Sequence, residues 1–181
     1  MNRALLLLPL ATFAIVLIFA VRGLTLDPAS PPSTLIDRPL PSLTLAPLDG
    51  YGDAFAPGDL QNGPSLVNVF GSWCVYCTVE HPFLMELAER NDLPIFGIDW
   101  RDPPGAGEAW LQRNGNPYAK VGADPQGLAI MELGVTGAPE TFLVDAEGVV
   151  RLHHRGPIDE RVWRRKFAPA LAKLRAAPAG V

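Results

Sequence analysis

The sequence holds two cysteines, Cys74 and Cys77, three positions apart. An apolar run at 67–70 leads into them and a helical pattern at 78–90 leads out, which predicts a strand, a tight turn and a helix that begins at the pair. The first turn of a helix has unpaired N–H groups and a partial positive charge, and both favour ionisation of a thiol placed there. Because the thiolate is the nucleophile, we predict a dithiol that closes and reopens a disulfide.

The spacing also assigns a role to each thiol. Cys74 and Cys77 would lie on one helix face, where they can reach disulfide geometry without a large backbone movement. Cys74, the more exposed and more acidic, is predicted to attack a substrate disulfide, and Cys77 to resolve the mixed disulfide. An inert disulfide is disfavoured because so short a loop restrains the unfolded chain little. A metal site would need further ligands such as His81, His153 or His154, and we predict none.

Predicted strands alternate with predicted helices along most of the chain, which indicates an α/β fold with helices on both faces of a sheet. The predicted strands are 43–45, 65–71, 94–100, 118–121, 141–145 and 149–153. The predicted helices are 74–90, 108–113, 126–133 and 158–177. A turn at Asp49 and Gly50 predicts a hairpin towards Phe55, and Pro169 is expected to disturb the last helix.

An uncharged run of eighteen residues, 4–21, lies between Arg3 and Arg22. It is just long enough to span a bilayer. A cleaved signal peptide is the alternative, but secretory apolar regions are usually shorter, and no A-x-A site stands near Ala20. We therefore expect an uncleaved transmembrane signal anchor at 1–22, with the rest of the chain outside the cytoplasm.

The segment 23–37 is rich in proline and small polar residues, which predicts a semi-stiff linker between the anchor and a domain at 38–181. The formal charge of −4 argues against nucleic-acid binding. Two exported cysteines at a spacing suited to disulfide exchange indicate a redox-active pair rather than a structural disulfide.

Several motifs together resemble the thioredoxin superfamily. Trp73 and the cysteine pair stand between a predicted strand and a predicted helix, and Pro82 occupies the place of the helix-kinking proline of thioredoxins. Residues 134–142, GVTGAPETF, are similar to the superfamily's cis-proline loop, with Pro139 as the cis residue. The resemblance implies a thioredoxin-like fold, in which a central mixed sheet is flanked by helices.

A narrower resemblance rests on the sequence around Pro139 and on Glu80 and His81, just beyond the cysteines. These motifs are similar to those of the CcmG/DsbE thiol:disulfide interchange proteins of bacterial cytochrome c maturation. The similarity covers about 35–175, together with the N-terminal transmembrane helix.

The resemblance implies a single-pass protein of the bacterial inner membrane with a reductase domain in the periplasm. Its substrate would be the disulfide of apocytochrome c, or of a protein of the haem-ligation machinery. Its electrons would come from a membrane thiol transporter of the DsbD/CcdA kind, and no cofactor is implied. Two alternatives stay open: a ResA/TlpA-type reductase for another exported substrate, and a Cu(I) carrier that uses the cysteine pair and a histidine.

The resemblance also directs attention to a proton acceptor. Asn68 stands six residues before Cys74, where thioredoxin has a buried aspartate, and an amide cannot titrate. Glu80, one turn beyond Cys77, is our candidate to take the Cys77 proton or to moderate the acidity of Cys74. The alternative is that Glu80 is a solvated charge on the helix.

Five residues are expected to form the substrate groove: Trp73, Tyr76, Ala138, Pro139 and Glu140. A cis Pro139 would leave the preceding backbone free to pair with an extended substrate peptide. Two of these residues have an alternative explanation. Trp73 could pack in the core, and Glu140 could be a simple surface charge.

Overall fold

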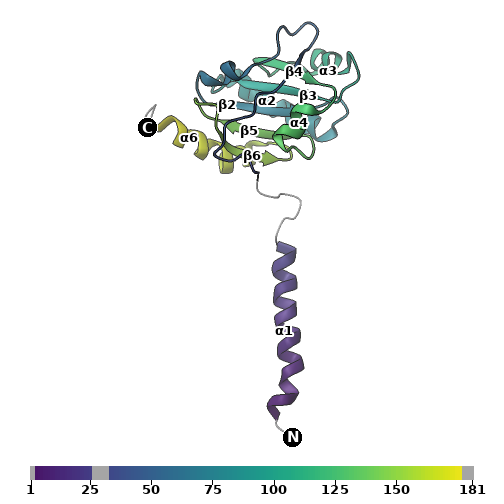
Figure 1. Cartoon of the computed structure of the whole chain (residues 1–181), viewed down its shortest axis with the longest axis vertical. Coiled ribbons are helices and arrows are strands. Elements are labelled where there is room, and N and C mark those ends of the chain that lie inside the picture. Colours follow the sequence, from purple (N-terminus) through teal and green to yellow (C-terminus); the bar gives the residue numbers. More distant parts are fainter. Residues whose placement is uncertain (1–2, 26–32, 177–181) are drawn as a thin grey trace. The chain divides into compact units, whose positions relative to one another are not determined.

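The computed structural model describes residues 3–25 and 33–176, and the chain forms two units, Met1–Pro32 and Ser33–Val181 (Figure 1). In the first unit, α1 (Arg3–Thr25) is a helix that contains Pro9. Among the residues that the structure describes, no helix has both the length and the hydropathy required to cross a membrane. The predicted linker 23–37 includes 26–32, which lie outside the described residues.

The second unit is built on a six-stranded mixed sheet with the order β1-β4-β3-β2-β5-β6. The central strands β2, β3 and β4 are parallel, and β5 and β6 add an antiparallel hairpin beside β2. The strands are β1 (Ala46–Pro47), β2 (Ser65–Phe70), β3 (Ile95–Trp100), β4 (Lys120–Asp124), β5 (Glu140–Val144) and β6 (Val150–Arg155). The predicted mixed sheet is therefore confirmed.

Two apolar clusters cover the two faces of the sheet. Within β2, Leu66 and Phe70 belong to one cluster, and Val67 and Val69 belong to the other, because successive side chains of a strand point to opposite faces. The first cluster includes α2 (Val75–Arg90), α3 (Ala106–Asn114) and the C-terminal helical region. The second includes α4 (Leu128–Leu133) and the short helix η1 (Pro57–Gln61).

The predicted helix at 158–177 is three consecutive segments: α5 (Glu160–Val162), a π-helical turn η2 (Trp163–Phe167) and α6 (Ala168–Ala176). The region begins late because the Asp159 side chain caps it by accepting the Val162 N–H at 2.6 Å. Pro169 has no N–H to donate to the preceding turn, which fits the irregular stretch just before it.

Three predictions near the sheet edge differ from the structure. The strand expected at 43–45 lies at Ala46–Pro47 and has only two residues, since proline restricts ladder pairing. The expected hairpin is a turn, closed by a hydrogen bond from Tyr51 N to Leu48 O, followed by irregular chain. The strand expected at 118–121 begins at Lys120 because the Asn116 side chain binds the backbone N–H and carbonyl of Tyr118.

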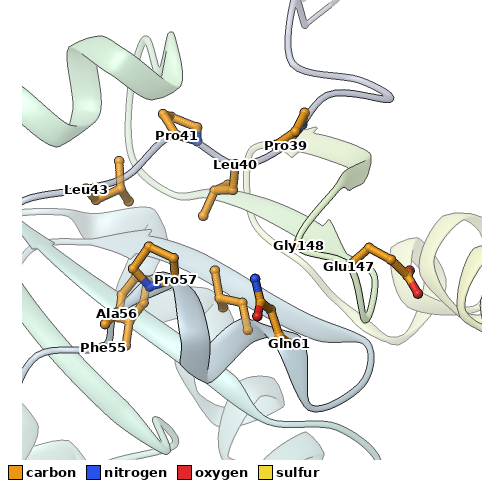
Figure 2. A pocket seen from close by; sticks show the side chains of 11 residues that line it. Pro39, Leu40, Pro41, Leu43, Phe55, Ala56, Pro57, Gln61, Glu147 and Gly148 are labelled. Carbon is orange, nitrogen blue, oxygen red and sulfur yellow. The ribbon is translucent and has the colours of Figure 1, made fainter.

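A small apolar cavity of about 90 Å³ lies between the segment 39–43, the segment 55–61 and the turn at Glu147 and Gly148 (Figure 2). Its walls are mostly proline, leucine and phenylalanine side chains. None of its lining residues belongs to the turn or helix that carries the cysteines, so this cavity is separate from the site described next.

Candidate active site

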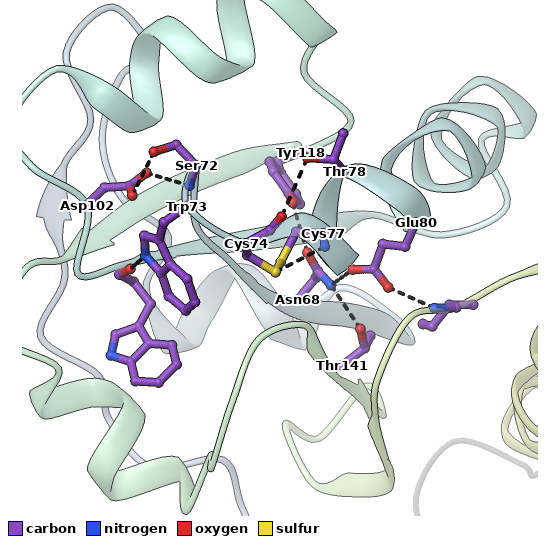
Figure 3. The surroundings of a disulfide bond; sticks show 12 residues. Asn68, Ser72, Trp73, Cys74, Cys77, Thr78, Glu80, Asp102, Tyr118 and Thr141 are labelled. Atoms are coloured by element: carbon purple, nitrogen blue, oxygen red, sulfur yellow. Dashed lines mark hydrogen bonds between the residues drawn. A yellow bond between two sulfur atoms is a disulfide. The ribbon is translucent and has the colours of Figure 1, made fainter.

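The two cysteines lie at the start of α2, directly after the strand β2, and form a disulfide with an S–S distance of 2.04 Å (Figure 3). Cys74 is the N-cap residue, and its Sγ accepts the N–H of Cys77 at 3.0 Å. The same N–H would stabilise a thiolate on Cys74 once the disulfide opens. Cys74 is 4% exposed and Cys77 is 2% exposed. The predicted dithiol at a helix start is confirmed.

The turn before the disulfide is held by residues at the end of β3 and just after it. The backbone N–H and the hydroxyl of Ser72 both donate to the Asp102 carboxylate, at 2.8 and 2.9 Å. The Trp73 indole N–H donates to the Trp100 carbonyl at 2.9 Å. Gly71 makes room for this arrangement, since a Cβ there would lie 2.6 Å from the Trp73 ring. The turn is thus fixed to the neighbouring strand from two sides.

Sequence reasoning missed the anchoring role of Asp102. No local pattern marked it, because the contact depends on β2 and β3 being adjacent and parallel, which brings the residues that follow each strand together at one end of the sheet. A second carboxyl group, Asp99, lies at this end of β3 and is buried. Burial, together with the hydrogen bond and charge of Asp102, raises the pKa of Asp99 above its usual range.

Four large apolar side chains are exposed around the cysteine turn, and we call them the apolar rim: Trp73, Val75, Tyr76 and Val79. Trp73 is 50% exposed and Tyr76 is 65% exposed. Packing of Trp73 in the core is therefore wrong as an explanation of that residue. Apolar surface left in water beside a reactive group is typical of a docking site.

Glu80 lies one turn beyond Cys77, and its carboxyl group is buried at 2% exposure. One oxygen accepts the side-chain N–H of Asn68 and the other accepts the backbone N–H of Ile158, both at 2.8 Å. Burial raises the pKa of Glu80 to about 7, although these two hydrogen bonds oppose the shift. The alternative of a solvated helix charge is wrong, and the carboxyl group can exchange a proton near neutral pH.

Asn68 connects Glu80 to the strand β5 and to the segment just before β4. Its side-chain amide also donates to Thr141 Oγ1 at 2.9 Å, and its carbonyl oxygen accepts the hydroxyl of Tyr118 at 2.8 Å. Figure 3 shows Asn68 between Glu80, Thr141 and Tyr118. From the sequence, Asn68 was noted only because an amide cannot titrate, and the roles of Tyr118 and Thr141 were missed.

The Ala138–Pro139 peptide bond is cis, as the resemblance implied. Glu140, the first residue of β5, pairs with Val69 near the end of β2. The loop that contains Pro139 therefore lies at the same end of the sheet as the cysteine turn. Ala138 packs against the apolar cluster that contains both cysteines.

The Glu140 carboxylate faces the interior of its own loop rather than solvent. One oxygen accepts the backbone N–H and hydroxyl of Thr136 and the N–H of Gly137, at 2.8 to 3.1 Å. The other oxygen lies 2.6 Å from His153 Nε2. Burial tends to raise the pKa of Glu140, but the hydrogen bonds from His153 and Thr136 outweigh it and lower the pKa. The surface-charge alternative for Glu140 is wrong.

Replacing Glu140 by alanine is expected to destabilise the protein by about 3 kcal/mol or more, because it leaves His153 and the loop N–H groups buried without their acceptor. Urea unfolding monitored by fluorescence measures the change. Glu147→Ala is the matched control: Glu147 is an exposed residue in the turn after β5, and its loss is expected to change stability by less than about 0.5 kcal/mol. Equal effects of the two substitutions would contradict this account of Glu140.

The three histidines that could have joined a metal site have other partners. His81 Nε2 lies 3.1 Å from Gly115 O, His153 bonds Glu140, and His154 Nδ1 lies 3.2 Å from Lys166 Nζ. Within residues 3–25 and 33–176, no group of three or more potential ligands could hold a metal ion.

The comparisons with known proteins agree with this geometry. Residues 36–171 match the Redoxin family. The chain is 44% identical over 174 residues to the thiol:disulfide interchange protein DsbE of Pseudomonas aeruginosa, covering 96% of each chain. The chain belongs to the DsbE thiol:disulfide interchange proteins. The DsbE protein of Allochromatium vinosum is 40% identical over 167 residues, which is 92% of each chain.

Solved structures show the same fold. A crystal structure of a putative DsbE thiol:disulfide interchange protein from Chlorobium tepidum superposes with a TM-score of 0.64 at 21% identity, covering 74% of this chain and 95% of that one. The predicted thioredoxin-like architecture is thus confirmed for the second unit. As a member of the DsbE family, the chain is a thiol:disulfide oxidoreductase whose redox pair is Cys74 and Cys77.

Proposed function

We propose that the protein is a membrane-anchored periplasmic reductase that opens the disulfide of apocytochrome c, or of a haem-ligation partner, before haem attachment. The observation that carries the proposal is a disulfide on a helix N-terminus, with the Glu80 carboxyl group buried one turn behind it. Membership of the DsbE family supports the substrate class.

The first step is attack by the reduced protein on the substrate. The Cys74 thiolate forms a bond to one sulfur of the substrate disulfide, the S–S bond of the substrate breaks, and the other substrate sulfur leaves as a thiolate. The Cys77 N–H that points at Cys74 Sγ lowers the cost of the negative charge on the nucleophile. The product is a mixed disulfide between Cys74 and the substrate.

The second step releases the substrate. Glu80 takes the proton of the Cys77 thiol, directly or through one water, and the Cys77 thiolate attacks Cys74 Sγ. The mixed disulfide breaks, the second substrate sulfur leaves as a thiolate, and the Cys74–Cys77 disulfide forms. The substrate has gained two electrons and the protein has lost them, so a thiol donor must reduce the pair again. A membrane thiol transporter of the DsbD/CcdA kind fits that need.

Substrate binding is assigned to the apolar rim and to the loop around Pro139. The rim offers apolar contacts on both sides of Cys74. Pro139, which has no N–H, precedes β5, and its own carbonyl already accepts the Gly156 N–H at 2.9 Å. Pairing with an extended peptide would therefore use the backbone of Ala138, as an added strand does.

The anchor is assigned to 1–22. Its support is the uncharged run 4–21 and its position within the helix α1. A tether of this kind would keep the domain at 38–181 near membrane-bound donors and acceptors and raise their effective concentration.

Trapping with the Cys77→Ser variant tests the substrate and the anchor together. Without Cys77 the second step cannot occur, so mixed disulfides through Cys74 are expected to accumulate. The full-length variant is expressed in a bacterium that makes c-type cytochromes, and membranes are washed with alkaline carbonate. Partners released by reductant are then identified by mass spectrometry.

The proposal expects apocytochrome c or a haem-ligation protein in the carbonate-resistant fraction. Trapped partners that belong to another exported pathway would replace this substrate with that of a ResA/TlpA-type reductase. Recovery of the chain only in the soluble fraction would reject the anchor. A Cys74→Ser, Cys77→Ser double variant is the control for partners held without a covalent bond.

A further inference from the structure

Asn68 lies at the centre of β2, is fully buried, and has a hydrogen-bond partner for each polar atom of its side chain. Its amide nitrogen donates to Glu80 Oε1 at 2.8 Å and to Thr141 Oγ1 at 2.9 Å. Its carbonyl oxygen accepts the hydroxyl of Tyr118 at 2.8 Å. These contacts use both amide hydrogens, so the side chain has no polar atom left without a partner.

The orientation of this amide matters for Glu80. An ionised carboxylate only accepts hydrogen bonds, so the group of Asn68 that faces it must be the amide nitrogen. The Tyr118 hydroxyl donates to the carbonyl oxygen of Asn68, and this hydrogen bond stabilises the orientation in which the amide nitrogen faces Glu80. If the amide turned over, its carbonyl oxygen would face the carboxylate, and the ionised form of Glu80 would be disfavoured.

The fold holds the Tyr118 ring in one position, which places its hydroxyl. The Tyr118 ring lies over Gly97 of β3, where a Cβ would lie 2.8 Å from the ring, and it stacks on Phe70 with centroids 4.9 Å apart. The Asn116 side chain holds the Tyr118 backbone at 3.0 and 3.3 Å. A ring locked in this way keeps its hydroxyl at one place beside Asn68.

The hydroxyl also stays protonated. Burial, with smaller contributions from the charges of Glu80 and Asp99, raises the pKa of Tyr118 well above its usual value. Tyr118 is therefore a hydrogen-bond donor throughout the pH range in which Glu80 titrates. The Ile158 N–H is the remaining donor to Glu80, and its position does not depend on Tyr118.

We infer that Tyr118 and Asn68 are positioning residues, which together hold the Glu80 carboxyl group in the orientation and protonation equilibrium that let it take the proton of Cys77. This inference rests on the role proposed for Glu80. The hydrogen bonds of the Tyr118 hydroxyl and the Asn68 amide lead to Glu80 and not to the sulfurs, so both residues act through Glu80 rather than on the substrate.

The test measures the titration of Glu80 in the oxidised protein, where neither cysteine titrates. The side-chain carboxyl carbon of Glu80 is followed by NMR in protein labelled with ¹³C-glutamate, and the signal is assigned with Glu80→Gln. Tyr118→Phe removes one hydroxyl and leaves the ring in place. The inference expects the Glu80 midpoint to rise by about one pH unit or more, the size expected when a buried charge loses hydrogen-bond support.

Tyr51→Phe is the matched control, because it also removes one tyrosine hydroxyl, and that hydroxyl meets the Glu108 carbonyl at 3.5 Å, away from Asn68. Its Glu80 midpoint should equal that of the wild type. Asn68→Asp is the second variant: it keeps the shape of the side chain but cannot donate to Glu80, and a larger upward shift is expected. An unchanged midpoint in Tyr118→Phe would overturn the inference, even if that variant were less stable.

A kinetic readout separates this inference from the proposed function. The rate of release from a mixed disulfide between Cys74 and a small aromatic thiol is measured against pH. Tyr118→Phe is expected to move the profile upward in pH in the wild-type background and to leave it unmoved in the Glu80→Gln background. A shifted Glu80 titration with an unmoved rate profile would support the positioning and reject the proton-transfer role of Glu80. No shift in either measurement would reject the positioning itself.

Discussion

Changing Cys74 to serine is expected to reduce disulfide exchange to the uncatalysed background. A serine hydroxyl does not ionise near neutral pH, so the variant has no nucleophile where the N–H of Cys77 points. The measurement uses reduced protein and an oxidised peptide that contains Cys-x-x-Cys-His, with the thiols of the peptide quantified over time. Because Trp73 adjoins Cys74, indole fluorescence follows the same reaction in the wild type.

Cys77→Ser is the informative partner of this experiment. It keeps Cys74, so it should consume about one equivalent of peptide as a mixed disulfide and then stop. The assignment of roles would be reversed if Cys77→Ser were inert and Cys74→Ser formed the mixed disulfide. Cys74 is the N-cap residue of α2 and its Sγ accepts the Cys77 N–H, which supports Cys74 as the attacking thiol and Cys77 as the resolving one.

The oxidised protein is expected to lose stability between about pH 4.5 and pH 7 through Glu80. The pKa of Glu80 is raised from 4.5 to about 7 in the folded protein. Over this range the folded state holds a proton that the unfolded state has already released. The stabilisation by Glu80 is therefore complete below the pKa of the unfolded state, and it is lost as the pH rises through the pKa of Glu80 in the folded state. The shift corresponds to about 3 kcal/mol.

Other buried groups also contribute to the pH dependence, so the measurement is a difference. Asp99 has a raised pKa and acts in the same direction, whereas His81 and His154 have lowered pKa values and act in the opposite one. These contributions cancel when urea unfolding of the wild type is compared with Glu80→Gln at each pH. The difference between the two free energies should change by about 3 kcal/mol across the range. Parallel curves would show that Glu80 does not titrate there.

Local sequence was sufficient to locate the redox pair and most of the elements around it. The spacing of Cys74 and Cys77 and the apolar strand before them predicted the strand, turn and helix that the structure contains. The motif around Pro139 predicted the cis peptide bond. These features depend on residues close together in the chain, and periodicity and motif spacing report such neighbours directly.

The polar contacts that support the pair depend on tertiary structure. Tyr118 is 50 residues from Asn68, Ser72 is 30 residues from Asp102, and His153 is 13 residues from Glu140. Each contact requires a particular strand order and register, which no local pattern specifies. The alternatives for Glu80, Glu140 and Trp73 were left open for the same reason.

The sequence by itself thus determined that two thiols stand at the start of a helix and that Glu80 follows one turn later. Only the tertiary structure decided that this carboxyl group is buried, and that Asn68 and the Ile158 N–H are its donors. Whether a charged side chain is buried depends on what packs over it. In this fold, β2 and the segment just before the C-terminal helical region both meet Glu80, and the low-dielectric surroundings that they create raise its pKa.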